Sequence, residues 1–382
     1  MTRPLQVAIV GYGIGGIAAS IHLRRLGYDI THFDRNDPPA VMGGGMLLHP
    51  PAQRELRELG VLESAVACGA PVRRITAQSA RGRALFEMGY SDVAGDYHGL
   101  GIQRGTLHRL MSCVDRGRAE VVCGSEIADV DAQVGMLVEA SGQRCGPFDL
   151  IVVADGANSV LRSKLSFPER RNQRSDSAAL VALLEDPDGY ATDRLVQHFD
   201  GARHVSVWPV GSDIPNGINR CSVAMNISQN EVRSLCMDGH WQDHVSSLCP
   251  GIGELLLAQP QVSPYVFSYR DVELVTCAIG RVVLIGDAAH SMSPQLGVGA
   301  QLAMQDAALL ARVLAEQVDV PSALSAYSRT RPMQLSRYQE ASRWLTPLFQ
   351  SNNRLLSHIR DRALGSAMRM PIVKQFARQL LA

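Results

Sequence analysis

A strand, a glycine-rich turn, a helix and a second strand follow one another near the start of the chain. Leu5–Val10 is a short apolar run that predicts a buried strand, and it leads into GYGIGG at residues 11–16. We expect a helix over Ile17–Leu26 and a second strand over Ile30–Phe33, which ends at Asp34 and Arg35. A β-α-β unit of this kind requires a parallel sheet, so the chain is predicted to contain an α/β fold.

The glycine pattern of this unit has a chemical interpretation. Gly11 allows a tight turn, Gly13 lets a diphosphate approach the backbone, and Gly16 lets the helix pack on the strand. The amino end of the helix attracts the diphosphate, and Asp34 can accept hydrogen bonds from a ribose. The pattern therefore predicts a dinucleotide site; the alternative is a glycine-rich turn in an ordinary α/β protein.

Two later strands also end at an acidic residue. Phe148–Val153 leads to Asp155, and Val282–Ile285 leads to Asp287. A loop containing His290, Pro294, Gly297 and Gly299 follows the second of these, and a helix is expected over Ala300–Glu316. Because a helix amino end carries unpaired N–H groups and partial positive charge, this loop suits a flat, electron-rich ligand.

Alternating hydrophobicity over residues 175–276 and 72–88 predicts antiparallel strands, with helices near 229–237 and 241–257 on one side of the sheet. We therefore expect a Rossmann-like α/β domain interleaved with an antiparallel-sheet α+β substrate domain and a C-terminal helical segment. The expected division assigns 1–72, 97–170 and 278–342 to the first domain, 73–96 and 171–277 to the second, and 343–382 to a helical arm.

Composition narrows the class of protein. The 382 residues include 37 basic and 37 acidic side chains, and this balance gives no reason to expect a nucleic-acid partner. The eight cysteines show no C-x-x-C spacing, and Met1–Pro4 leads directly into the first strand, so we expect reduced thiols and a cytoplasmic enzyme. The basic segment 343–382 favours an arm or dimer contact over a membrane-surface helix, and either a monomer or a homodimer fits.

Three motifs stand in a fixed order: GYGIGG, then ADGANSVLR at 154–162, then GDAAHSMSPQLGVG at 286–299. In this order they resemble the class A flavoprotein monooxygenases, the para-hydroxybenzoate hydroxylase-like family. The resemblance implies that the dinucleotide is FAD, that NADH or NADPH binds transiently as reductant, and that O2 reacts through a flavin C4a-hydroperoxide. It also implies a small aromatic or heteroaromatic substrate that becomes hydroxylated.

The resemblance assigns roles by position. Residues that would contact FAD are Gly11, Gly13, Ile14, Gly15, Gly16, Asp34, Arg35, Gly45, Leu47, Arg104, Asp155, Asp287, Pro294, Gly297, Gly299 and Ala300. Ser159 and Arg162 belong to the motif that the family uses for both FAD and the nicotinamide cofactor. This chain departs from the family at Gln301 and Pro51, where Asn is usual, and carries Asp34 where Glu is usual.

Two assignments concern the reaction itself. His49 is a candidate base that ionises a substrate hydroxyl, although its loop could equally use it to bind a backbone group; Pro294 would line the reacting ring. Strand alternation cannot say which face of the inserted sheet meets the substrate. Candidates for substrate contact are His198, Val207, Trp208, Pro209 and Met225.

Other functions remain open. A dehydrogenase or reductase of the same fold would consume reductant without inserting oxygen, and a flavin-binding protein without activity would use the fold as a partner platform. A flavin-dependent halogenase is disfavoured because the W-x-W-x-I-P motif is absent. His240 and His244 have the i, i+4 spacing of a metal site, but no third ligand is evident, so we expect no metal.

Overall fold

The computed structural model describes residues 3–37, 43–79, 82–94, 97–115, 119–201, 203–237 and 240–350, together with short pieces of 360–378. Within this part of the chain, no helix is long and apolar enough to cross a membrane. The described residues form two large sheets and two small ones.

The first large sheet is the centre of the α/β domain. Its strands are, in spatial order, β18 (Ala278–Ile279), β19 (Val282–Leu284), β12 (Leu150–Val153), β1 (Gln6–Val10), β2 (Asp29–Asp34) and β8 (Glu120–Cys123). All neighbours pair in parallel except β18 with β19. The carboxyl ends of β1, β2, β12 and β19 therefore meet at one edge of the sheet, as the α/β prediction requires.

Residues 120–145 contribute to two different sheets. β8 pairs with β2 in the large sheet. A separate small sheet contains β9 (Ile127–Asp131), β10 (Met136–Glu139) and β11 (Arg144–Cys145). The alternation in the sequence predicted the strands, but it could not choose their partners.

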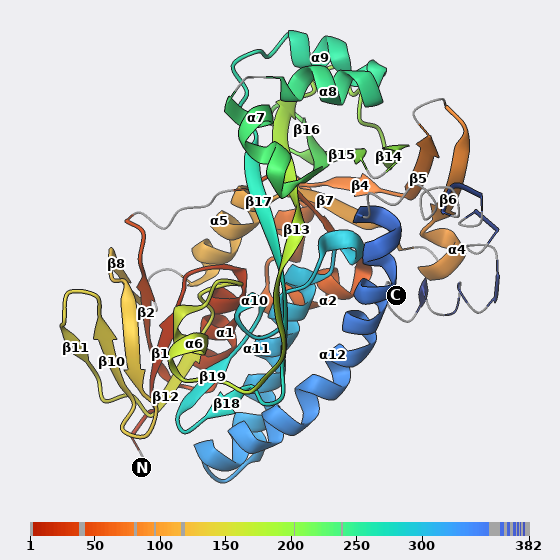
Figure 1. Ribbon diagram of the computed structural model, residues 1–382. Coiled ribbons are helices and arrows are strands. Elements are labelled where there is room, and N and C mark those ends of the chain that lie inside the picture. The colour runs from red at the N-terminus through yellow and green to blue at the C-terminus, as the bar shows by residue number, and fades with distance from the viewer. Residues whose placement is uncertain are drawn as a thin grey trace.

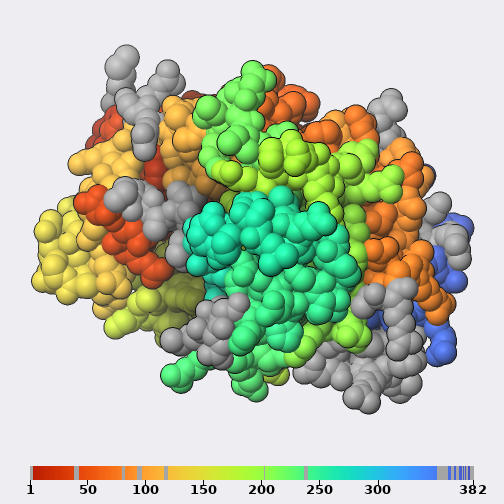
Figure 2. Space-filling model, turned by 90° about the horizontal axis from the view of Figure 1, so that it is seen from above, coloured from red at the N-terminus to blue at the C-terminus, as the bar shows by residue number. Residues whose placement is uncertain are grey.

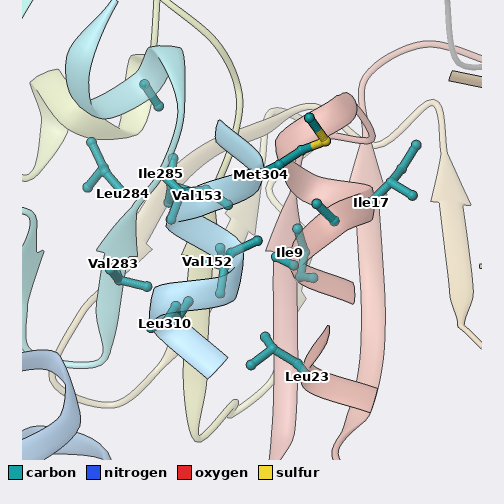
Figure 3. Close-up of a cluster of buried hydrophobic side chains, with 14 of the residues drawn as sticks. Ile9, Ile17, Leu23, Val152, Val153, Val283, Leu284, Ile285, Met304 and Leu310 are labelled. Atoms are coloured by element: carbon teal, nitrogen blue, oxygen red, sulfur yellow. The ribbon is translucent and has the colours of Figure 1, made fainter. Parts of the chain in front are cut away.

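The main core lies where α1 (Ile14–Arg25) and α11 (Gly299–Glu316) cover this sheet. Figure 3 shows Ile17 of α1 and Met304 of α11 in the same buried cluster as Ile9 and Val152 of the strands. The two helices approach closely at Gly15, where an added Cβ would lie 3.3 Å from the Ala303 Cβ. Complete burial of each such aliphatic side chain contributes about 1.5–3 kcal/mol.

The second large sheet is almost wholly antiparallel. Its order is β17 (Tyr265–Leu274), β13 (Glu169–Glu185), β16 (Arg220–Ser228), β15 (Arg203–Gly211), β14 (Arg194–Asp200), β5 (Arg74–Ser79) and β6 (Ala84–Gly89). Only β14 and β5 pair in parallel. One face is covered by α7 (Val232–Met237), α8 (Trp241–Leu248) and α9 (Gly253–Leu257), which lie at the top of Figure 1 and in the foreground of Figure 2.

The other face of this sheet turns toward a small sheet and the α/β domain (Figure 1). The small sheet has the order β3 (Gly45–Leu48), β7 (Gly99–Gln103) and β4 (Ala70–Val72). The remaining elements are α2 (Pro50–Leu59), α3 (Leu62–Cys68), α4 (Ser91–Ala94), α5 (Arg104–Asp115), α6 (Val160–Lys164), α10 (Asp287–His290), α12 (Val320–Gln350), η1 (Gln229–Glu231), η2 (Pro250–Ile252) and η3 (Pro294–Leu296).

The C-terminal segment is described only in part. The expected arm, 343–382, starts inside α12, and residues 351–359 and many later ones lie outside the described part of the chain. Arg360 is described: it is buried, and its guanidinium lies 4.3 Å from the centre of the Phe199 ring. The division into two domains and an arm stays a prediction.

Candidate functional site

The glycine turn after β1 leaves open space beside its backbone on one side only. Gly11 has φ +102°, and a Cβ there would lie 2.4 Å from the Ala154 carbonyl oxygen. A Cβ at Gly16 would lie 2.2 Å from the Gly11 carbonyl oxygen, whereas a Cβ at Gly13 would meet no atom within 4 Å. Gly11 and Gly16 therefore serve internal packing, and Gly13 presents bare backbone to open space. Ile14 is buried beside the turn.

Asp34 joins the end of β2 to this turn. Its Oδ2 accepts a hydrogen bond from the Tyr12 backbone N–H at 2.9 Å, and its Oδ1 accepts one from the Asn36 backbone N–H at 2.9 Å. Two carboxylate oxygens offer about four acceptor positions, so capacity remains for a ligand hydroxyl. Arg35 is exposed next to it.

The loop after β12 contains a buried carboxylate oxygen without a partner. No described group donates to Asp155 Oδ1, and burial raises the pKa of this carboxyl group despite hydrogen bonding by Ser159. Arg162 is almost fully buried and donates to the carbonyl oxygens of Ala157 and Ala288 at 3.0 and 2.8 Å. Arg162 therefore ties the loop after β12 to the loop after β19.

The loop after β19 brings Asp287 next to the amino end of α11. A Cβ at Gly299 would lie 3.9 Å from Asp287 Oδ1, and Asp287, Pro294, Gly297 and Gly299 are all exposed. Ala300 follows in the first turn of the helix and is half-buried. These residues form an accessible wall in front of unpaired helical N–H groups.

Beneath this wall lies a buried ionic cluster around Asp306. Asp306 Oδ2 lies 2.6 Å from His290 Nε2 and accepts from the Gly286 N–H at 2.5 Å, while Oδ1 accepts from Arg331 Nε of α12. Burial opposes ionisation, yet Arg331 and His290 hold the pKa of Asp306 below its usual value. His290 thus supports the loop from within.

His49 connects three segments. Its Nδ1 lies 2.6 Å from the Tyr90 hydroxyl, and its Nε2 lies 3.0 Å from the carbonyl oxygen of Leu296 in η3. Burial lowers the pKa of His49 to about 4, so the ring is neutral at physiological pH. Leu47 and Gly45 precede it in β3, and the Leu47 carbonyl oxygen lies 3.9 Å from a Cβ built on Gly297. This arrangement supports the backbone-binding alternative for His49.

Three further positions have a physical account. Arg104 is exposed as the first residue of α5, and its backbone N–H donates to the Gly44 carbonyl oxygen at 3.0 Å. Pro51 occupies the first turn of α2, where a missing N–H leaves no bond unmade. Gln301 is buried, and its Nε2 lies 3.4 Å from the Tyr338 hydroxyl of α12.

The substrate candidates require a correction. Val207 and Met225 belong to the core beneath α7–α9, and His198 lies 3.3 Å from Cys249 in the same layer. Pro209 pairs with Cys221 of that core, so it shares this face. Trp208 alone points the other way, with its Cδ1 3.5 Å from a Cβ built on Gly101. Other elements cover both faces of the sheet. The alternation of side chains along a strand therefore could not show which face turns toward the α/β domain.

Two residues that sequence reasoning missed also belong here. Tyr90 follows β6 and meets His49, and Ser222 of β16 accepts a hydrogen bond from the Gly45 N–H at 3.0 Å. Neither Tyr90 nor Ser222 belongs to a sequence motif. Each of their contacts joins segments that are far apart in the chain. His240 and His244 lie at α8, and the described residues contain no group of three metal-ligating side chains.

These features fit a dinucleotide with a flat ring. The bare backbone at Gly13 suits a diphosphate, the unpartnered Asp155 Oδ1 can accept a ligand hydrogen bond, and the exposed wall at Pro294–Gly299 leaves room for a ring. All lie at the edge where β1, β2, β12 and β19 end.

Comparison with known proteins points the same way. The model of a family described as "FAD binding domain" matches residues 4–340. A protein of Rhodococcus erythropolis, provisionally named a 2-heptyl-3-hydroxy-4(1H)-quinolone synthase, is 29% identical over 341 residues, covering 88% of this chain and 86% of that protein. The 6-hydroxynicotinate 3-monooxygenase of Bordetella bronchiseptica is 26% identical over 358 residues, covering 88% and 90%.

Solved structures share the fold. Klebsiella pneumoniae HpxO, in complex with FAD and uric acid, superposes with a TM-score of 0.83 at 21% identity, covering 99% of this chain and 97% of that one. The tetrameric form of 2-methyl-3-hydroxypyridine-5-carboxylic acid oxygenase gives a TM-score of 0.79 at 19% identity, covering 94% and 97%.

Proposed function

The chain belongs to the FAD-binding-domain family of flavoprotein monooxygenases, and from this premise we propose how its own residues serve that chemistry. The enzyme uses FAD, with NADH or NADPH as reductant, to insert one atom of O2 into an aromatic or heteroaromatic ring. The observation that carries the proposal is the meeting of the glycine turn, Asp155, Asp287 and the amino end of α11 at one sheet edge.

Different residues at that edge bind different parts of the cofactor. Gly13 and the start of α1 hold the diphosphate, and Asp34 with Arg35 holds the adenosine end. Asp155, Asp287 and Arg104 bind the middle of the cofactor, and Gly45, Leu47 and the 294–300 wall border the ring.

The chemistry that FAD supplies when bound is acceptance of a hydride and activation of O2. The protein supplies orientation and fixed dipoles. The amino end of α11 carries partial positive charge, which would stabilise negative charge on a ring bound in front of it. His49 acts as a positioning residue: its Nε2–H holds the Leu296 carbonyl, and Tyr90 fixes its tautomer. Pro294 begins the wall that the His49 bond holds in place.

The likeness to named relatives supports an electron-rich ring as substrate. One relative carries a hydroxyquinolone name and another a hydroxynicotinate name, so hydroxylated nitrogen heterocycles are the class to test first. A cytoplasmic location and a monomeric or homodimeric state remain predictions from the sequence; one structural neighbour is a tetramer.

The test is substrate-stimulated oxidation of NADH and NADPH by the holoenzyme, with oxygen uptake and hydrogen peroxide measured together. A hydroxylating enzyme gives stimulated oxidation and a hydroxylated product, with little peroxide. A dehydrogenase or reductase gives oxidation of reductant that persists without O2 and a product without added oxygen, and that result would overturn the proposal.

A further inference from the structure

The substrate class can be inferred from the face of the seven-stranded sheet that turns toward the α/β domain. Side chains alternate between the two faces of a strand, and directly paired residues share a face. Leu180 and Ala182 of β13 and Val223 of β16 pack beneath α7–α9. The intervening residues therefore point to the opposite side. We call this side the inner face and define it by Val181, Ser206, Trp208, Ser222, Ala224 and Asn226.

Close contacts show that the inner face meets the segment that borders the ring site. A Cβ at Gly44 would lie 2.0 Å from Val181 Cγ1, and one at Gly45 would lie 2.5 Å from Ser222 Cβ. The Gly45 N–H donates to Ser222 Oγ. Substitution of either glycine would push the two surfaces apart, so the inner face is the side that a substrate beside the ring would contact.

The inner face has no free charge. At one end Arg220 is paired with Asp213 at 2.5 Å and Glu185 at 3.6 Å. At the other end Arg360 is paired with Asp361 at 2.7 Å. Between these pairs, the described strand residues on this side include no Arg, Lys, Asp or Glu.

The opposing segments contribute no cation of their own. Residues 43–49 and 293–299 contain no charged side chain apart from His49, whose ring is neutral. The Arg104 side chain lies against Gly43, and the proposed function assigns it to the cofactor. Asp287 beyond these segments is an anion. A carboxylate buried among these groups would lack a counter-ion, and an unpaired buried charge is strongly unfavourable.

The inner face does offer one neutral donor. Trp208 is 7% exposed, and its Nε1 has no hydrogen-bond partner among the described residues. A buried N–H without a partner is destabilising, so the site is completed by a ligand atom that accepts this bond. A ring carbonyl or hydroxyl oxygen meets the requirement without bringing charge.

We infer that the substrate is an uncharged hydroxylated heteroaromatic compound, whose ring oxygen accepts from Trp208 Nε1, rather than an aromatic carboxylate. The inference rests on the proposed function, because it specifies the substrate class of the same site. Ring size and any apolar substituent are accommodated by the aliphatic part of the inner face.

The test compares 4-hydroxyquinoline with 4-hydroxyquinoline-2-carboxylate, and 3-hydroxypyridine with its 5-carboxylate, on the holoenzyme. Binding is measured by calorimetry and turnover by NAD(P)H oxidation. The uncharged member of each pair is expected to bind at least about 100-fold more tightly. Equal or tighter binding of the carboxylates, or no binding by either uncharged compound, overturns the inference. Binding of the uncharged compounds without hydroxylation supports the inference and overturns the proposed function instead.

Two variants sharpen the result. Ala224→Arg places a cation on the inner face and should bring carboxylate binding to within about tenfold of the uncharged compound, whereas Leu257→Arg, at an 81% exposed site, should leave the preference unchanged. Trp208→Phe should weaken binding of 4-hydroxyquinoline about tenfold and leave binding of quinoline, which lacks the oxygen, unchanged. FAD content reports whether each variant folds; a folded Ala224→Arg variant that still rejects carboxylates contradicts the inference.

Discussion

His49 Nε2 lies 3.0 Å from the Leu296 carbonyl oxygen, and this contact joins the loop after β3 to the wall that we propose borders the ring site. A carbonyl oxygen only accepts, so Nε2 carries the proton and Nδ1 accepts from the Tyr90 hydroxyl. Both ring nitrogens are thus engaged. A base would need one of them free, which is why we assign His49 a positioning role.

The neutral state of His49 makes stability depend on pH. Burial lowers its pKa from 6.5 to about 4, so between these values the unfolded chain binds a proton that the folded chain does not. The stabilising contribution is complete above pH 6.5 and is lost as pH falls toward 4. His49→Gln should remove up to about 3 kcal/mol of this pH dependence, measured by urea unfolding from pH 7.5 to 4.5. His240→Gln, at an exposed site, is the control; wild-type and His49→Gln curves that run parallel would refute the assignment.

Substitutions at Gly13 and Gly16 should affect cofactor binding and folding separately. Gly16→Ala places a Cβ 2.2 Å from a backbone oxygen and should destabilise the apoprotein by at least roughly 2 kcal/mol. Gly13→Ala meets no protein atom, so the stability of the apoprotein should change by less than about 0.5 kcal/mol while the Kd for FAD rises at least roughly 100-fold. Chemical unfolding and flavin fluorescence titration measure the two quantities. Tight FAD binding by Gly13→Ala would place the diphosphate elsewhere.

Substitution of the buried Asp306 should strongly lower the free energy of unfolding. Asp306→Asn leaves the Arg331 charge buried without its partner, so the free energy of unfolding should fall by about 3–5 kcal/mol. The Gly286 N–H also loses a charged acceptor, which should weaken FAD binding. Glu316→Gln, at an exposed position of the same helix, serves as the matched control in urea unfolding. A loss below about 1 kcal/mol would show that the cluster is not the support of the loop.

Gln301 should matter through Tyr338 rather than through the cofactor. Gln301→Asn shortens the side chain and breaks the hydrogen bond to the Tyr338 hydroxyl, so unfolding should become easier by about 1 kcal/mol. Tyr338→Phe removes the same bond, and the double variant should be no worse than either single one. Unchanged FAD affinity in all three is expected; additive losses of stability would mean that the two residues do not interact.

The residues of the proposed cofactor site could be predicted from the sequence because their signals are local. The glycine turn, Asp155 and Asp287 each directly follow a predicted strand, and parallel strands place such residues at one edge. The inner face of the second sheet depends on which layer covers each side. His198 and Met225 point toward α7–α9 for that reason, and only the packing of Val181 and Ser222 against the glycine loop identifies the opposite side.

Contacts between residues that are far apart in the sequence could not be predicted either. Tyr90 meets His49, Arg331 meets Asp306, and Tyr338 meets Gln301, and each pair joins separate elements without a shared motif. At the two departures from the family pattern, Gln301 contacts Tyr338 and Pro51 lies in the first turn of α2.

The most direct test of the account is incubation of the holoenzyme with NAD(P)H, 4-hydroxyquinoline and ¹⁸O₂, followed by mass spectrometry of the product. The account predicts a hydroxylated product that carries one ¹⁸O atom for each NAD(P)H oxidised. Oxidation of NAD(P)H with matching formation of labelled hydrogen peroxide, and no label in the organic product, would contradict it.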